Sequence, residues 1–516
     1  MKRPKVLIIG IDGATPDLVL PWCKEGKLPN INRLVNEGIY GNLESTIPPI
    51  TPAAWTSFLT GKNPGKHGIF DFMEREPGSY NFRYINARSR KSPSLWKLLS
   101  DNGYKVGVLN VPMTYPPEEV NGFLISGLDA PDEKSAVYPK GLFEELDKNV
   151  GGFQLDIRHL GNMKSDSQRS AFLQEVQDVE EQRVKVLLYL QQKYNCDFLM
   201  LVFNATDQVQ HHFWHYMDPS HPKYDPAGSE KYGDAIFNIY RKIDELIGKL
   251  YKELRPTDAV VLMSDHGFGP TSKYYLSTNH MLEEAGLLTF KNKGLLVNIS
   301  VKTEKILKSV LSDNQKKFVA NLLPTFREKF ENFNLLGALD WKKTRAFAFE
   351  LTGLAPFIWI NDGNSFPNGT VWYEREKGEI LKIIDDTFQS LTDPADNNKI
   401  GTNVYFKSGI FSGPYSGNGP DAVVGSWEDT GFNIKRNYTN DNGSSFFGID
   451  NTPFLSGTEW SGTHRINGIF LIAGDYIQHN GELSGAGICD IFPTVLSIFD
   501  LPVPDGTDGK VLKHQD

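Results

Sequence analysis

Residues 48–70 read PPITPAAWTSFLTGKNPGKHGIF, and an apolar pattern with helical spacing runs through them from Thr51 to Gly61. We expect the Thr51 side-chain oxygen to cap this helix, because Pro52 then stands at the first helical position, where a missing N–H costs nothing. Gly61 is expected to end the helix. The Thr51 hydroxyl would then lie among free backbone N–H groups at the positive end of a helix, which favours an anion such as a phosphate.

Length and composition are those of an ordinary globular protein. The chain has 516 residues and a net charge of −9, and it has no long basic run, so we expect no nucleic-acid-binding surface. Its three cysteines stand far apart, which indicates neither a disulfide framework nor a thiolate zinc site. The apolar run near the first residue is too short for a signal peptide or a membrane span. We therefore expect a soluble, cytoplasmic protein.

Short apolar runs alternate with amphipathic helical patterns along most of the chain. Runs typical of strands buried on both faces occur at 5–11, 105–110, 122–127, 197–203, 259–263 and 468–473. Helical patterns occur at 16–23, 29–36, 93–101, 165–194, 230–252 and 490–499. This alternation predicts an α/β fold in which helices flank a mostly parallel central sheet.

The middle of the chain interrupts the alternation. Residues 281–338 are rich in lysine and helical in pattern, and we interpret them as an inserted cap over the site. Residues 339–460 have a mixed α+β pattern and would join the cap to the core, with a helix at 380–391 and a strand at 421–425. The catalytic core would then consist of residues 1–280 and 461–516.

Side chains that can bind metals gather where the predicted strands begin or end. They are Asp12, Asp207, His211, Asp265, His266 and His464. Functional residues of open α/β sheets lie at the carboxyl ends of strands, so these side chains are expected to converge. Asp207 and His211 are four residues apart, which places both on one face of a helix.

The combination of residue types predicts a bimetallic centre. Three carboxylates, three imidazoles and the Thr51 hydroxyl suit two zinc-like divalent ions. Carboxylates alone would repel one another and raise each other's pKa, whereas two dications would offset this repulsion and leave positive charge for a phosphate. Such a centre serves in-line displacement at phosphorus, in which one ion would hold the Thr51 oxygen as an alkoxide and the other would neutralise the leaving oxygen.

At this point the chain resembles the alkaline phosphatase superfamily, and within it the type I phosphodiesterase/nucleotide pyrophosphatase branch. The resemblance rests on GIDG at 10–13, the stretch at 48–72, TDQVQHHFWHYMDPSHPKYD at 206–225, SDHGFG at 264–269, SGTHR at 461–465 and the tail at 489–512. It implies an alkaline-phosphatase-like three-layer sandwich and Thr51 as a covalent nucleophile. The implied ligands of one metal are Asp12, Thr51, Asp265 and His266, and those of the other are Asp207, His211 and His464. The implied metal is zinc, with manganese as the alternative.

The resemblance also implies a small-molecule phosphodiester substrate and a phospho-threonine intermediate. The chain departs from nucleotide pyrophosphatases after His67, where Phe70-Asp71-Phe72 lacks the asparagine that orients a phosphoryl oxygen in those enzymes. The candidate substrate-binding residues are Lys66, His67, Asp71 and Arg465.

Three alternatives remain open at this stage. A phosphomonoesterase would need an extra cationic clamp, for which Lys62, Lys66 and Arg465 are the candidates. A phosphomutase or phosphotransferase would use the same metal core. A catalytically silent metal-binding or adaptor protein would keep the ligands without turnover. The oligomeric state is left open.

Overall fold

The computed structural model describes residues 2–157, 163, 165–291, 339–349, 355–393, 396–425, 427, 433–434, 447–449 and 460–513. Most of the predicted cap, from residue 292 to residue 338, lies outside the described residues. The division of the chain into core, cap and joining segment therefore stays a prediction.

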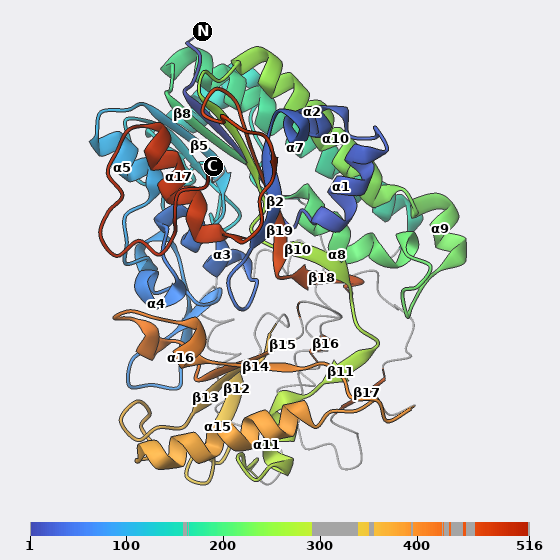
Figure 1. The fold of residues 1–516 in the computed structure, drawn as a ribbon, viewed down its shortest axis with the longest axis vertical. Helices are drawn as coiled ribbons and strands as arrows, with labels where there is room; N and C mark the ends of the chain where they lie inside the picture. The colour runs from blue at the N-terminus through green and yellow to red at the C-terminus, as the bar shows by residue number, and fades with distance from the viewer. Residues whose placement is uncertain are drawn as a thin grey trace.

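A ten-stranded sheet forms the centre of the larger lobe (Figure 1). Its strands follow the order β20-β2-β19-β9-β1-β8-β5-β6-β7, and β21 pairs with β2. Their bounds are β1 (Val6–Ile11), β2 (Gly38–Glu44), β5 (Val106–Val111), β6 (Gly122–Ser126), β7 (Val137–Tyr138), β8 (Phe198–Phe203), β9 (Ala259–Met263), β19 (Asn467–Ala473), β20 (Gly481–Glu482) and β21 (Ala486–Gly487).

The centre of this sheet is parallel, as the alternating pattern predicts. β9, β1, β8, β5 and β6 run side by side in the same direction, whereas β19 is antiparallel to both β9 and β2. β2 was not predicted, because Gly38 and Gly41 break its apolar pattern. Both glycines let neighbouring backbone approach β2 closely. A Cβ on Gly38, for example, would lie 2.2 Å from the Ile472 carbonyl oxygen.

The two faces of the sheet bury different side chains of the same strands. In β1, Leu7 and Ile9 belong to one apolar core and Val6 and Ile8 to the other, as the two-residue period of a strand requires. The first core includes α1 (Pro16–Lys24), α2 (Pro29–Glu37), α7 (Asp166–Tyr194), α8 (Ala205–Met217) and α10 (Ala235–Leu254). The second includes α3 (Thr51–Thr60), α5 (Leu95–Asp101) and α17 (Ile491–Ile498). These layers confirm the predicted three-layer α/β sandwich (Figure 1).

Smaller elements complete the larger lobe. They are α4 (Pro64–His67), η1 (Ala87–Ser89), α6 (Leu142–Val150), α9 (Pro226–Tyr232), η3 (Ile488–Asp490) and the antiparallel pair β10 (Gly267–Pro270) and β18 (Gly462–Arg465).

A second sheet with its own apolar core forms the lower lobe in Figure 1. Its antiparallel strands, in spatial order, are β12 (Ala346–Phe349), β13 (Phe357–Ile360), β15 (Ala422–Gly425) and β14 (Asn403–Phe406). The other elements here are β3 (Met73–Arg75), β4 (Phe82–Tyr84), β11 (Tyr274–Leu276), α11 (Thr278–Glu284), α15 (Glu374–Gln389), α16 (Lys407–Ile410), η2 (Ser416–Asn418), β16 (Asn433–Ile434) and β17 (Phe447–Ile449).

This second core also draws on segments from inside the first 290 residues. Phe82 of β4 stacks on Phe349 of β12, with ring centroids 3.8 Å apart, and Leu276 of β11 is buried in the same cluster.

Across all the described residues, no helix is both long enough and apolar enough to cross a membrane.

Candidate active site

The helix that carries Thr51 begins one residue earlier than predicted. Thr51 is the first residue of α3, and Ile50 occupies the capping position, so the expectation that the Thr51 oxygen caps the helix is wrong. The hydroxyl instead lies 3.5 Å from His266 Nε2. The expected stop is confirmed, because Gly61 adopts a left-handed conformation with φ of 65° and donates its N–H to the Ser57 carbonyl.

A first group of potential ligands forms where two neighbouring strands end. Asp12 directly follows β1, and Asp265 and His266 follow the adjacent β9. His266 Nε2 lies 3.2 Å from Asp265 Oδ2 and 3.6 Å from Asp12 Oδ1. One ligand atom from each of the three residues lies within 4.8 Å of the others, and all three side chains are buried.

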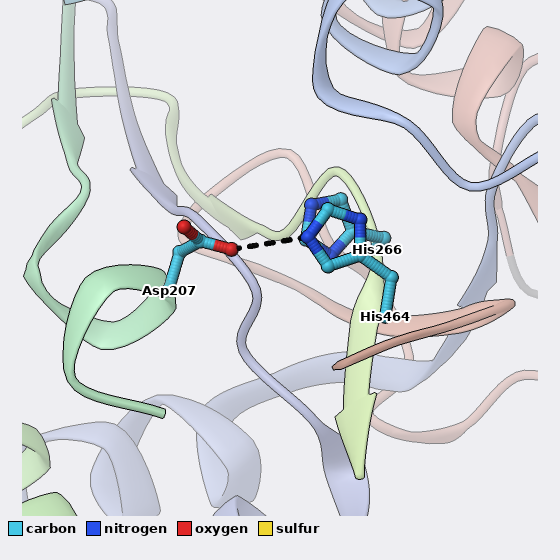
Figure 2. Close-up of side chains that lie close together, drawn as sticks. All are labelled: Asp207, His266 and His464. Carbon is cyan, nitrogen blue, oxygen red and sulfur yellow. Dashed lines mark ion pairs between the residues drawn. The ribbon is translucent and has the colours of Figure 1, made fainter. Parts of the chain in front are cut away.

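A second group combines α8 with β18. Asp207 and His211 lie one turn apart on α8, as their spacing predicts, and His211 Nε2 is 3.3 Å from Asp207 Oδ1. His464 approaches from β18, and its Nε2 is also 3.3 Å from Asp207 Oδ1. Figure 2 shows Asp207 reaching toward the stacked rings of His464 and His266, whose centroids are 3.6 Å apart. The two groups therefore adjoin through His266.

Backbone carbonyls orient the three imidazoles. The Nδ1 atoms of His211, His266 and His464 lie 2.9, 3.1 and 2.8 Å from the carbonyl oxygens of residues 462, 267 and 49 respectively. A carbonyl can only accept a hydrogen bond, so each Nδ1 donates and each Nε2 of a neutral ring keeps its lone pair. All three Nε2 atoms face the carboxylates. With the proton on Nδ1, each ring is in the tautomer whose Nε2 can bind a metal ion.

Burial and mutual repulsion shape the charge state of the carboxylates. Burial, and then the nearby negative charge of Asp265, raises the pKa of Asp12 well above its usual range. Burial also raises the pKa of Asp265 well above the usual range. Asp207 differs: burial acts to raise its pKa, but His211 and His464 outweigh this and hold it well below the usual range. The pKa of His266 is lowered by burial and then by His464.

The donor set fits divalent cations. Asp12 Oδ1, Asp207 Oδ1 and Asp265 Oδ2 are buried oxygens with no hydrogen-bond partner among the described residues. Buried acceptors of this kind carry a high cost unless a cation or a donor binds them. Together with three Nε2 lone pairs, they form an N/O ligand set typical of zinc and related ions.

Some residues that support the site carry no sequence signal. Trp55, which we expected only as an apolar position of α3, donates its Nε1–H to Asp12 Oδ2 over 3.3 Å. Ser45 donates to the Asp265 carbonyl and Ser264 to the His266 carbonyl, each over 2.5 Å. The Trp55 and Ser45 contacts join segments far apart in sequence, so periodicity and motif spacing do not indicate them, whereas Ser264 and His266 are two residues apart within one motif.

Two of the candidate substrate-binding residues are engaged in structural contacts. The ring of His67 is fully buried, with Nε2 2.9 Å from Ser57 Oγ and Nδ1 accepting the Ile69 N–H, which leaves neither nitrogen for a substrate. Burial, then Arg90, lowers the pKa of His67 to about 3. The Lys66 ammonium pairs with the Asp508 carboxylate and donates to a backbone carbonyl.

The other two candidates, Arg465 and Asp71, also contact groups of the protein. Arg465 is next to His464, but its guanidinium donates to the Pro270 carbonyl over 2.6 Å and to the His464 carbonyl over 3.0 Å. Asp71 is buried, accepts the Phe72 N–H over 2.7 Å, and lines a small pocket between the segment that follows α4 and strands β12 and β13. The structure thus brings the seven proposed metal-site residues together, whereas Lys66, His67 and Arg465 bond to other groups of the protein.

A buried ion pair anchors the start of α8. Glu180 of α7 accepts the N–H groups of Asn204 and Ala205, and it pairs with Arg183 over 2.8 Å. Arg183 also donates to the Asn204 side chain and to the Leu155 carbonyl. A carboxylate is favourable at the N-terminus of α8, which is the positive end of the helix dipole. The Glu180 contacts also fix where the first turn of α8, which carries Asp207, begins.

Replacing Arg183 with methionine should destabilise the fold. The change leaves the Glu180 carboxylate buried without its cation, and we expect a loss of about 3 kcal/mol in the free energy of unfolding. Urea titration of the wild type and the variant measures it. Arg241→Met, at an exposed position of α10, is the control and should change stability by less than about 0.5 kcal/mol. Equal midpoints for both variants would contradict the prediction.

A family model described as "Type I phosphodiesterase / nucleotide pyrophosphatase" matches residues 6–341. The chain belongs to this family. The match covers more than half of the chain and includes Asp12, Thr51, Asp207 and the Asp265-His266 pair. The resemblance inferred from the motifs is thereby confirmed. The chain is a metal-dependent enzyme that hydrolyses phosphoric esters, and the alternative of a silent adaptor protein is set aside.

Solved structures agree on the fold. The phosphonoacetate hydrolase of Sinorhizobium meliloti 1021, solved in complex with phosphonoacetate, has a TM-score of 0.55 and 14% identity, over 96% of each chain. Human ectonucleotide pyrophosphatase/phosphodiesterase 5 has a TM-score of 0.51 and 14% identity, over 98% of this chain and 97% of the human one. A comparison with curated proteins found no match.

Proposed function

We propose that this family member is a phosphodiesterase that uses Thr51 as its nucleophile at a site for two divalent metal ions, zinc with manganese as the alternative. One observation carries the proposal. The Thr51 hydroxyl stands at the first residue of a buried ten-residue helix and beside His266, the residue that the two ligand groups share as a neighbour.

The two groups divide the ligands between the ions. Asp12, Asp265, His266 and the Thr51 hydroxyl would hold one ion. Asp207, His211 and His464 would hold the other. Bound divalent ions supply Lewis acidity and positive charge for in-line displacement at phosphorus.

The chain's own groups perform the covalent step. Thr51 Oγ1 loses its proton and attacks phosphorus, the bond to the leaving oxygen breaks, and the departing alcohol takes up a proton. Water then attacks the phospho-threonine, which releases the phosphate monoester and returns a proton to Thr51. The N–H groups of Thr51 and Ala53 in the first turn of α3 have no acceptor among the described residues, and they would bind phosphoryl oxygens.

The contacts of the nearby cationic side chains favour a diester substrate over a monoester. A monoester carries a second negative oxygen, which calls for an additional cationic clamp. Lys66 pairs with Asp508, Arg465 binds backbone carbonyls, and Lys62 lies 3.5 Å from Ser92 Oγ. All three candidate clamps thus have partners elsewhere in the fold.

Steady-state hydrolysis of bis-p-nitrophenyl phosphate and of p-nitrophenyl phosphate tests this preference. With zinc-loaded protein we expect kcat/KM for the diester to exceed that for the monoester by at least about tenfold, because an unclamped charge costs on the order of 1.4 kcal/mol or more. The same assay on manganese-loaded protein decides between the metals. A higher kcat/KM for the monoester would replace the proposal with a phosphatase or phosphotransferase on the same core.

A further inference from the structure

We propose that Gln210 is a positioning residue that joins the two ligand groups, because it reaches from the helix of the second group to the loop of the first. The inference rests on the proposed function, in that it takes both groups to be metal sites. Gln210 lies on α8 between Asp207 and His211 and is fully buried. Its side chain contacts the segment that follows Asp12.

The first contact fixes the glycine next to Asp12. Gln210 Nε2 donates to the Gly13 carbonyl over 2.8 Å, and the Gly13 N–H donates to Asp265 Oδ1 over 3.2 Å. Gly13 has a φ of 68°, and a Cβ there would lie 2.9 Å from the Phe268 ring, so this position requires glycine. Gly13 thus accepts a hydrogen bond from Gln210 of α8 and donates one to Asp265, a proposed metal ligand.

The second contact fixes the amide of Gln210 itself. The Tyr240 hydroxyl of α10, also fully buried, donates to Gln210 Oε1 over 3.1 Å and accepts the Thr15 N–H over 3.4 Å. With its oxygen held by Tyr240, the amide can present only its NH₂ group to Gly13. Tyr240 and Gln210 therefore hold the loop after Asp12 at two residues, 13 and 15.

The arrangement couples the proposed metal sites through one helix. Asp207 and His211 point from α8 into the second group, and Gln210 on the same helix orders the loop that holds Asp12 in the first. Groups that orient metal ligands from behind typically change metal affinity by about 10- to 100-fold when they are removed. We therefore expect a substitution of Gln210 to lower the metal affinity of the first ligand group, although Gln210 lies on the helix that carries ligands of the second group.

Zinc titration against a chromogenic chelator tests this inference without an activity readout. The measurement is made in an Asp207→Asn background, so that the first group dominates binding. Adding Gln210→Met removes both hydrogen bonds at similar volume and should weaken zinc binding by about 10- to 100-fold. Tyr240→Phe removes only the outer contact and should act in the same direction, with a smaller effect. Gln208→Met, on the same helix, is the matched control and should stay within about twofold, since Gln208 contacts Asp156 rather than the loop.

The outcomes separate this inference from the proposed function. Unchanged zinc affinity in Gln210→Met, while Asp12→Asn in the same background abolishes binding, overturns the role of Gln210 alone. Unchanged affinity in Asp12→Asn overturns both proposals. Equal losses in Gln210→Met and Gln208→Met would show general damage to α8 and would also overturn the inference. Should Gln210→Met fail to fold, Tyr240→Phe decides: a weaker site supports the inference and wild-type affinity overturns it.

Discussion

Replacing Thr51 with alanine should reduce hydrolysis of bis-p-nitrophenyl phosphate by at least about 1,000-fold, because removal of a covalent nucleophile takes away the step on which turnover depends. The wild type and Thr51→Ala are compared by steady-state kinetics at equal zinc occupancy. The fold should survive the change, since the Thr51 side chain makes no capping bond in α3 and loses only a hydroxyl and a methyl group.

Two further threonine variants make this result specific. Thr51→Ser keeps a hydroxyl at the same place and should retain measurable turnover. Thr60→Ala is the matched control, since Thr60 is buried on the same helix and its hydroxyl donates to the Thr56 carbonyl. We expect Thr60→Ala to keep kcat near the wild-type value. Turnover in Thr51→Ala at more than a tenth of the wild-type rate would reject Thr51 as the nucleophile.

Replacing Asp12 with asparagine should have opposite effects on activity and on stability. Loss of a proposed metal ligand should lower kcat/KM by at least about 100-fold, because metal ions contribute several kcal/mol of transition-state stabilisation. The metal-free protein should become more stable, because the change removes one of two adjacent buried carboxylates, Asp12 and Asp265, that repel each other. We expect the free energy of unfolding to rise, because Asp265 no longer faces a second buried carboxylate.

The pH dependence of this gain follows from the raised pKa of Asp12. The folded protein binds the Asp12 proton more tightly than the unfolded chain does, so this group stabilises the fold below its unfolded pKa. That contribution is lost as the pH rises through the folded pKa. The asparagine variant has no such proton to lose, so its advantage over the wild type should grow with increasing pH.

Chelator-treated protein unfolded in urea at several pH values measures the effect. Asp17→Asn, an exposed position in the first turn of α1, is the control and should leave both activity and the pH dependence nearly unchanged. A metal-free Asp12→Asn protein that is less stable than the wild type at every pH would contradict the proposed repulsion. Full activity in Asp12→Asn would remove Asp12 from the metal site.

Local patterns were sufficient for much of the fold. The apolar run at 259–263 coincides with β9, and the pattern at 165–194 is within one residue of α7. The spacing of Asp207 and His211 predicted that both would share a helix face, because 3.6 residues per turn follow from backbone geometry alone. Such features depend only on neighbours in sequence.

The pairings that bring distant segments together were not predictable in this way, although His464 was expected among the ligands. His464 reaches the site because β18 pairs antiparallel with β10, in a register that places His464 opposite Phe268. Lys66 and His67 were expected to bind the substrate. In the folded protein Lys66 forms an ion pair with Asp508, and His67 is buried with its ring against Ser57. A residue's type and local spacing do not specify which remote group will lie beside it.

By itself, the sequence predicted the α/β class from the periods of its strands and helices, and the family and the candidate metal ligands from its motifs, because residue types and their periods are local properties. Only the tertiary structure decided which atoms face one another: the Nε2 atoms turned toward the carboxylates, Trp55 against Asp12, and Gln210 between the two ligand groups. The physical reason is that hydrogen bonds and buried charges act over a few ångströms. Their partners are therefore chosen by how strands and helices pack.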